Sequence, residues 1–351
     1  MSVREWLDER VRYRGVGAFL EHKVVPRHRY AFTYYTGGMT LFFFLIQVLT
    51  GLLLLMYYRP TADAAFESMR LIMARVRFGW LVRAVHVWSA NLMILAVVLH
   101  LGATFFTKAY RRPREVTWLT GVGLFFITLT FGFTGYLLPW NTLAYFATQV
   151  GTEIAGDVPF IGKAVLVLLR GGEDVTEATL SRFFGIHVAI LPAVTTLLLG
   201  LHLLLVQVHG MSRPVAVRPT GSEPFYPHFM LRDFLVWVVL LGGVAALATL
   251  VPWELGEKAD PLAPAPQGLK PEWYFLFMYQ ALRMLPARVL WFEGEMLGVF
   301  AFVVAATVLI FVPFLDVWAQ RERRHHLFTV AGVVAVLFVI AMTILGLTAN
   351  F

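Results

Sequence analysis

The sequence predicts an all-α integral membrane protein of about seven transmembrane helices with additional surface helices. Hydrophobic residues make up 58% of the 351 residues and charged residues only 15%, and the mean hydropathy is +0.69. A soluble domain of this length has no means of hiding so much apolar surface from water. A bilayer needs about 20 apolar residues per helix, and such runs occur at 37–58, 79–106, 115–138, 183–208, 233–252, 296–315 and 327–349.

The segment before the first span, residues 1–36, is predicted to lie at the inner face. Val3, Trp6, Leu7 and Val11 recur at helical spacing among charged residues, a pattern typical of a helix in the headgroup region. A partly ordered polar tail is the alternative. No short apolar core is followed by a small-residue cleavage site, so we expect no signal peptide.

The distribution of basic residues predicts the orientation of the chain. An odd number of spans places the two ends on opposite sides of the membrane. With the N-terminus inside, Lys and Arg outnumber the acids in the inner segments, whereas the two are nearly balanced in the outer ones. Basic residues concentrate on the inner side of membrane proteins, so we expect the N-terminus inside and the C-terminus outside.

Two outer connections are long enough to hold structure of their own. Residues 139–182 contain "VPFIGKAVLVLLRGG", which is too short to span and is predicted to form helices on the outer surface. Residues 253–288 contain the proline-rich "ADPLAPAPQGLKPEWY", and the short stretch "WYFLFMYQALRML" is predicted to form a buried or interfacial helix. Long loops in compact proteins are usually functional.

Four of the ten histidines fall well inside spans. His86 and His100 on the second span have the spacing i, i+14, and His187 and His202 on the fourth have the spacing i, i+15. These intervals correspond to about 21 and about 22 Å of helical rise, with about 40° and about 60° of rotation. Because both spans run from outside to inside, His86 can face His187 near the outer surface, and His100 can face His202 near the inner surface.

Facing histidines at two depths predict two stacked haems with bis-histidine ligation, held in a dihaem four-helix bundle in the N-terminal half. Iron ligated in this way has no open position, so it moves electrons and does not activate oxygen. The chain has no cysteine, so these would be non-covalent haems, and any iron–sulfur cluster belongs to another subunit. A simple transition-metal site is disfavoured because each level offers only two nitrogens. A transporter with histidine proton relays is an alternative that predicts no haem.

Glycines on the first and third spans repeat the histidine interval. Gly37 with Gly51, and Gly121 with Gly135, have the same i, i+14 spacing as His86 with His100. Glycine leaves room for a porphyrin between helices, although other glycines nearby leave the choice of partner open. Arg83, one turn before His86, either pairs with a haem propionate or extends to the outer interface.

With these motifs the sequence resembles the cytochrome b family, the core subunit of Rieske/cytochrome b (cytochrome bc) quinol-oxidising complexes. The matching stretches are "YYTGGMTLFFFLIQVLTG", "RAVHVWSANLMILAVVLH", "RRPREVTWLTG", "GFTGYLLPW", "VPFIG", "ATLSRFFGIH" and "KPEWY", and they cover most of residues 30–316. The resemblance implies that His86 and His187 bind the outer, low-potential haem. It likewise implies that His100 and His202 bind the inner, high-potential haem.

The resemblance also implies a quinol site at the outer face. In this family the "PEWY" loop closes a quinol pocket, and its glutamate accepts a quinol proton and passes it outward. The corresponding residues here are Pro271, Glu272, Trp273 and Tyr274, with Tyr136 and a helix over 151–162 lining the pocket. A carboxylate near apolar walls has a raised pKa and can shuttle a proton near neutral pH. The alternative is an acid that only favours the dipole at a helix N-terminus.

Some features combine two branches of the family. "EPFYPHFMLRD" is similar to the respiratory type, in which an acid at the position of Asp233 belongs to the inner quinone site. The i, i+15 spacing on the fourth span is similar to the photosynthetic type, which is split into two chains, yet here both parts share one chain. Tyr35 stands where photosynthetic relatives carry a cysteine holding an extra haem, so we expect that haem to be absent or not covalent.

Taken together, the resemblance implies a dihaem cytochrome b subunit of a quinol:cytochrome c (or similar acceptor) oxidoreductase in an energy-conserving membrane, such as a bacterial inner membrane. Its expected partners are quinone, a Rieske-type iron–sulfur subunit and a cytochrome c-type or similar acceptor subunit, in a dimeric complex without nucleic acid. The predicted domains are 1–36, the haem domain 37–210, and 211–351 with the PEWY loop. The alternative is a dihaem membrane anchor of a dehydrogenase or hydrogenase, which would leave the PEWY loop without a role.

Overall fold

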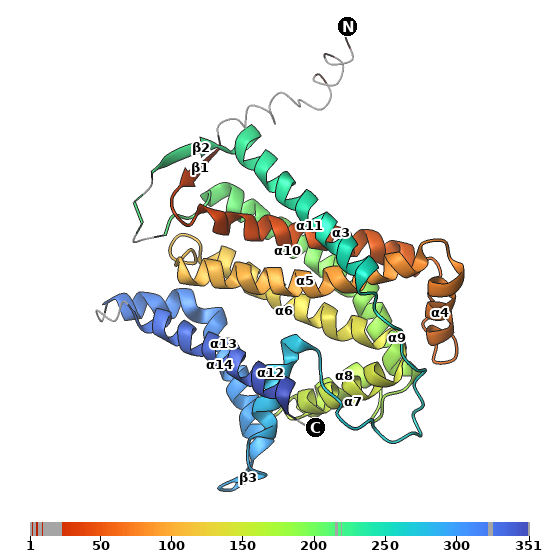
Figure 1. Cartoon of the computed structure of the whole chain (residues 1–351). Coiled ribbons are helices and arrows are strands. Elements are labelled where there is room, and N and C mark those ends of the chain that lie inside the picture. The colour runs from red at the N-terminus through yellow and green to blue at the C-terminus, as the bar shows by residue number, and fades with distance from the viewer. Residues whose placement is uncertain are drawn as a thin grey trace.

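The computed structural model describes residues 2, 5, 9, 23–214, 217–218, 220–321 and 326–349. The amphipathic helix predicted from Val3, Trp6, Leu7 and Val11 lies outside the described residues. The remainder is mostly helical, with two short two-stranded ribbons (Figure 1).

In the part of the chain that the structure describes, seven helical segments are long and apolar enough to cross a bilayer, which confirms the predicted number of spans. They are Ala31–Leu55 (η1, Ala31–Tyr34, and α3, Tyr35–Leu55), Gly79–Phe106 (α5), Glu115–Leu137 (α6), Glu177–His209 (α9, Glu177–Gly185; η2, Ile186–Ile190; α10, Leu191–His209), Phe225–Leu250 (η3, Phe225–Phe229; α11, Met230–Leu250), Gly294–Val317 (within α13, Gly294–Arg321) and Leu327–Thr348 (α14).

Four shorter helices lie in the connections predicted to be outer: α4 (Ala65–Arg75), α7 (Thr142–Gly156), α8 (Gly162–Arg170) and α12 (Trp273–Arg283). The predictions of surface helices within 139–182, and of a short helix after the proline-rich linker, are confirmed. The prediction of one helix over 151–162 is wrong, because α7 ends at Gly156 and α8 begins only at Gly162. Between them Phe160 has a φ of 69°, which an α-helix does not allow.

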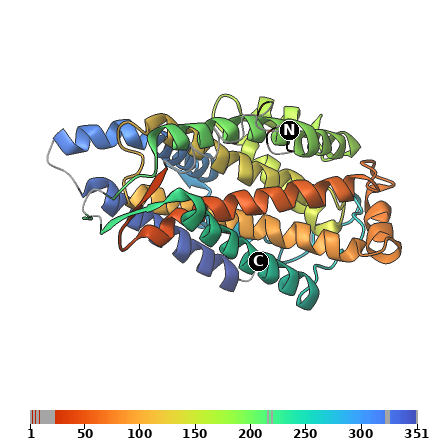
Figure 2. The ribbon, with the colours of Figure 1, turned by 90° about the horizontal axis from the view of Figure 1, so that it is seen from above.

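The histidine-bearing spans belong to two helix pairs. Helix α3 packs against α5, and α6 packs against α10, while α5 and α6 join the pairs into one bundle. Figures 1 and 2 show these four helices running side by side. Around this bundle, α11 packs against α3 and α5, α13 packs against α6, and α14 packs against α12. The later spans thus support the bundle and hold the PEWY helix against it.

An antiparallel ribbon joins two distant parts of the sequence beside the bundle. Strand β1 (Val24–Arg27) pairs with β2 (Gly221–Pro224), so that Val24 faces Pro224 and Arg27 faces Gly221. A second ribbon, β3 (Arg288–Val289) with β4 (Phe292–Glu293), leads into α13. Lys23, directly before β1, donates to the carbonyl of Gln207 near the end of α10 at 2.5 Å. The first ribbon therefore lies at the predicted inner side.

Buried charged groups fix each end of the bundle. At the outer end Arg170, the last residue of α8, is buried and donates from Nε to Thr152 Oγ1 at 2.7 Å and from Nη2 to the Gln149 carbonyl at 2.7 Å. These bonds hold α8 on α7. At the inner end Arg111 Nε lies 2.6 Å from Oδ2 of the buried Asp316 on α13. This ion pair joins the loop between α5 and α6 to the later spans.

Candidate functional site

The four intramembrane histidines form two levels within the bundle. His86 on α5 lies near His187 on the fourth span, and His100 on α5 lies near His202 on α10. His187 lies in η2, a single π-helical turn. A π turn takes up an additional residue, so the i, i+15 spacing on the fourth span acts as the i, i+14 spacing does on the second. The histidines on each helix consequently keep a common face.

Each of the four predicted glycines lies against one of these histidine rings. A Cβ added at the glycine would approach the ring atom Cε1 at 3.2 Å for Gly37 and His100, 3.4 Å for Gly51 and His86, 3.1 Å for Gly121 and His202, and 2.6 Å for Gly135 and His187. Other glycines of these helices meet different groups: Gly38 meets Asp233, Gly123 meets Leu198, and Gly132 meets Tyr274. The structure thereby distinguishes the histidine-facing glycines, which the sequence left open.

Four threonines that sequence reasoning missed complete the histidine environment. Each directly precedes a histidine-facing glycine, and its Oγ1 lies within hydrogen-bonding distance of a histidine Nδ1. The distances are 3.0 Å for Thr36 and His100, 2.8 Å for Thr50 and His86, 2.9 Å for Thr120 and His202, and 3.1 Å for Thr134 and His187. The available signal was the dipeptide Thr-Gly, which occurs twice on each of two spans and repeats the glycine spacing.

The donor set fits haem better than a bare metal ion. The side-chain hydrogen bonds of all four rings are made through Nδ1, which leaves Nε2 available as a metal ligand. Among the described residues no three His, Cys, Asp or Glu side chains gather as a metal site. A porphyrin supplies four nitrogens itself and needs only two axial ligands, and the glycines remove side chains from the helix faces beside the rings.

Arg83 makes structural hydrogen bonds that neither of its two predicted roles included. Its side chain is buried, and it donates from Nη1 to the Trp253 carbonyl at 2.6 Å and from Nη2 to the Glu254 carbonyl at 3.2 Å. These bonds tie α5 to the segment that follows α11. Within the described part of the chain its Nε has no hydrogen-bond partner. One buried donor therefore remains for an anionic group such as a propionate.

The carboxyl group of Glu272 is turned toward the bundle. Glu272 is the N-cap residue of α12, but its side chain makes no capping hydrogen bond. Instead it hydrogen-bonds with the Tyr136 hydroxyl on α6. Burial raises the pKa of Glu272, and the bond from Tyr136 partly offsets this rise. A role limited to the helix dipole does not explain a side chain held by a neighbouring helix.

The other residues of the PEWY loop are also fixed against α5 and α6. Trp273 Nε1 donates to Asn91 Oδ1 on α5 at 2.8 Å. The Tyr274 hydroxyl lies beside Gly132, where an added Cβ would stand 2.7 Å away. Burial, with the nearby Glu272 and Tyr136, raises the pKa of Tyr274. Gly132 lies one helical turn before the glycine that faces His187, so Tyr274 and Glu272 lie next to the outer histidine level.

Pro271 supports this arrangement from the N-terminal side of α12. It follows Lys270, whose Nζ donates to the Leu347 carbonyl near the end of α14 at 2.9 Å. Proline disfavours a helical conformation in the residue before it, so the helix starts after this point. The Lys270 bond and the start of α12 together fix the position of Glu272.

Asp233 lies beside the inner histidine level. It belongs to the first turn of α11, and its carboxylate lies against Gly38, the residue after the glycine that faces His100. Its Oδ1 is buried without a hydrogen-bond partner in the described residues. Nearby, Tyr35 stacks on Phe229 with ring centroids 4.9 Å apart and planes at 7°. An unpartnered buried oxygen at this place fits a site for a polar ligand.

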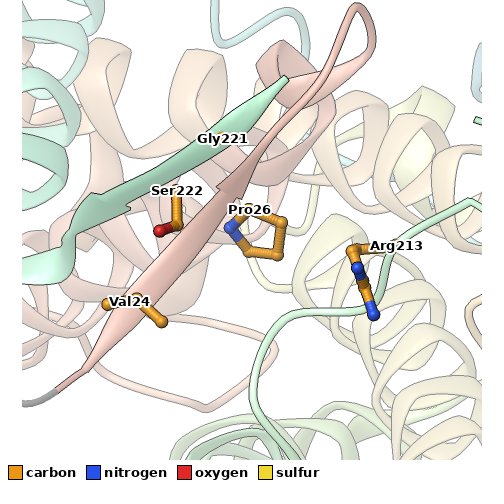
Figure 3. Close-up of a pocket in the computed structure, with 5 residues that line it drawn as sticks. All are labelled: Val24, Pro26, Arg213, Gly221 and Ser222. Atoms are coloured by element: carbon orange, nitrogen blue, oxygen red, sulfur yellow. The ribbon is translucent and has the colours of Figure 1, made fainter. Parts of the chain in front are cut away.

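Two residues at the inner end of α10 use their backbone carbonyls. Gln207 accepts from Lys23, and the His209 carbonyl accepts from Arg114 Nη2 at 2.9 Å. A surface cavity of about 410 Å³ lies between the first ribbon and Arg213 (Figure 3). None of the predicted site residues lines it, so it carries no assignment.

Comparison with known proteins shows which family the sequence matches. The family model "Cytochrome b/b6/petB" matches residues 20–210, and "Cytochrome b(C-terminal)/b6/petD" matches residues 258–350. A cytochrome bc complex cytochrome b subunit of Chlorobaculum thiosulfatiphilum is 46% identical over 349 residues, covering 97% of this chain and 80% of the relative. Cytochrome b6 of Synechococcus elongatus is 41% identical over 214 residues, covering 61% of this chain and 99% of the relative.

A solved structure has the same fold. A chain of a hyperthermophilic respiratory Complex III matches with a TM-score of 0.86 and 32% identity, over 99% of this chain and 92% of that one. The N-terminal and C-terminal family regions, which the sequence suggested are joined here, do occur in one chain. Proteins of this family bind haem b. The chain is thus an integral membrane protein that belongs to the cytochrome b/b6 family.

Proposed function

We propose that this chain is the cytochrome b subunit of a bc-type complex that oxidises quinol at its outer face and reduces quinone at its inner face. The observation that carries the proposal is the pair of histidine levels, each with two glycines against its rings. The similarity to a cytochrome bc complex cytochrome b subunit and to a chain of a respiratory Complex III supports the same proposal.

Two haem b groups would be held by Nε2 of His86 and His187 at the outer level, and of His100 and His202 at the inner level. When bound, they would supply one-electron transfer between the two faces of the membrane. The chain contributes rings in a fixed orientation, glycine faces beside them and, at Arg83, a buried N–H for a carboxylate. One quinol electron would pass to the haem at the outer level and the other to an iron–sulfur cluster, which must belong to a partner because this chain has no cysteine.

At the outer site Glu272 takes a proton from the quinol hydroxyl. Oxidation of a quinol releases two protons and two electrons, so a base must lie beside the hydroxyl group. Glu272 fits this task because burial raises its pKa, which brings a carboxylate nearer to neutral pH. Tyr136 holds the carboxyl group in place, Tyr274 closes the pocket beside Gly132, and Pro271 and Trp273 fix the loop.

At the inner site Asp233 supplies protons to a quinone. Its buried, unpartnered oxygen beside Gly38 is placed to hydrogen-bond a quinone carbonyl or the hydroxyl that forms from it. The proposal includes a cytochrome c-type or similar final acceptor, a dimeric complex, the N-terminus on the inner side, and the domain boundaries given above. Protons then leave outside and enter inside, which contributes to a proton gradient.

A reduced-minus-oxidised spectrum recorded during a redox titration, with a pyridine haemochrome assay, tests the proposal. We expect two b-type haems per chain with separate midpoint potentials. One haem or none in protein purified after adequate haem supply would refute the histidine pairing. Two haems without quinol-dependent reduction in the assembled complex would instead favour a simple electron-carrying anchor.

A further inference from the structure

We propose that Thr36, Thr50, Thr120 and Thr134 are positioning residues that set which histidine nitrogen binds iron and lower the midpoint potential of the haem at their level. This inference rests on the proposed function, since it requires haem at the histidines. The groups concerned are the four threonine hydroxyls, each of which lies within hydrogen-bonding distance of a histidine Nδ1.

The hydrogen bonds of these hydroxyls determine the histidine tautomer. Each hydroxyl donates its own hydrogen to a carbonyl one turn earlier: Thr36 to Thr33 at 2.7 Å, Thr50 to Ile46 at 2.6 Å, Thr120 to Thr117 at 2.9 Å and Thr134 to Thr130 at 2.8 Å. A hydroxyl has one hydrogen and can accept through its lone pairs. The oxygen must therefore accept from the histidine, so Nδ1 carries the hydrogen and Nε2 carries the free lone pair.

The same bond affects the iron. When the second nitrogen of a ligating histidine donates to an oxygen, the ring becomes a more basic ligand with a fixed orientation. A more basic ligand stabilises oxidised iron more than reduced iron, which lowers the midpoint potential. Removal of the acceptor oxygen should accordingly raise the potential of the haem at that level and leave the other haem unchanged.

The two helices differ in how much they depend on the threonine. On the fourth span a backbone carbonyl also lies near each ring, that of Phe131 near His187 and that of Thr117 near His202. No such carbonyl contact is found for His86 and His100 on α5 within the described structure. Loss of Thr50 or Thr36 should therefore shift the potential more than loss of Thr134 or Thr120.

The experiment compares valine and serine at Thr50 and Thr36 in the full-length protein. Valine keeps the shape and removes the hydroxyl, whereas serine keeps the hydroxyl. Thr128→Val is the matched control, because Thr128 is buried on α6 and donates to the Leu124 carbonyl at 2.8 Å but is not bonded to any described histidine. The readouts are haem per chain, midpoint potentials from a redox titration, and the electron paramagnetic resonance signal of each ferric haem.

We expect T50V to raise only the outer potential and T36V only the inner one, with serine restoring both and T128V changing neither. If a valine variant loads no haem, loading of its serine counterpart supports the proposal, and failure of both overturns it. Unmoved potentials in T50V and T36V, or equal shifts with valine and serine, also overturn it. Absence of two haems from the wild type would be a failure of the proposed function, and it is recognised before any variant is made.

Discussion

Gly135 and Gly51 offer a matched test of the outer histidine level. Both glycines face this level, Gly135 against His187 and Gly51 against His86. A Cβ at Gly135 would stand 2.6 Å from Cε1 of His187, while a Cβ at Gly51 would stand 3.4 Å from Cε1 of His86. Because ordinary contact begins at 3.4 Å, the His187 ring must retreat by the difference between these two distances, and the His86 ring need not move.

The magnitude follows from the cost of overpacking. Forcing an additional methyl group into a packed core costs about 1–3 kcal/mol, which corresponds to about 5- to 150-fold in an equilibrium constant at tenfold per about 1.4 kcal/mol. Alanine also favours both helices over glycine by about 1 kcal/mol. That gain is the same in both variants, so the difference between them isolates the ring contact.

The assay is haem content with a redox titration after purification under limiting haem. We expect G135A to lose the outer haem preferentially, by about 5- to 150-fold in affinity, and G51A to retain both haems. The inner haem serves as an internal control in each sample. Equal haem loss in G135A and G51A, or full retention of the outer haem in G135A, would refute the contact argument.

Three further predictions concern the charged groups. Burial raises the pKa of Glu272, so between its unfolded-state pKa and its folded-state pKa the folded protein binds more protons than the unfolded protein. Stability therefore falls as pH rises through this window. E272Q should remove that fall, measured by thermal unfolding, and should lower quinol oxidation at least about tenfold. Y136F should raise the pKa of Glu272 further, because the Tyr136 bond lowers it, and should shift the rise of quinol oxidation with pH to higher pH; an unshifted profile would contradict the role of the bond. D316A should lower the free energy of unfolding by about 3–5 kcal/mol, because it leaves the Arg111 charge without its buried partner. The double variant R111M/D316A should recover part of this loss. A double variant that loses as much stability in thermal unfolding as the two single variants together would contradict the pairing.

The spans were predictable because each is long and apolar. The second span was predicted as 79–106, and α5 runs over those residues. The fourth span begins at Glu177 instead of 183, because Thr176 forms a capping box at the start of α9 and the helix therefore extends beyond its apolar part. Hydropathy detects burial in lipid, whereas it does not detect a cap.

The site was only partly predictable for a different reason. Histidine intervals on regular helices fix height and face, which suffices to pair His86 with His187 and His100 with His202. The sequence could not show that η2 absorbs one residue, because a π turn has no simple sequence signal. Nor could it show that Glu272 turns to Tyr136 instead of capping α12, since that choice depends on how two segments far apart in the sequence come together.

The pairing of Val24–Arg27 with Gly221–Pro224 constrains the order in which the protein assembles. These strands are separated by four spans, so the ribbon cannot close until the chain has been synthesised beyond residue 224. Closing so long a loop costs chain entropy that only later contacts repay. During biosynthesis, strand β1 therefore stays unpaired until the histidine-bearing helices have been synthesised. The ribbon at this end of the bundle forms only afterwards.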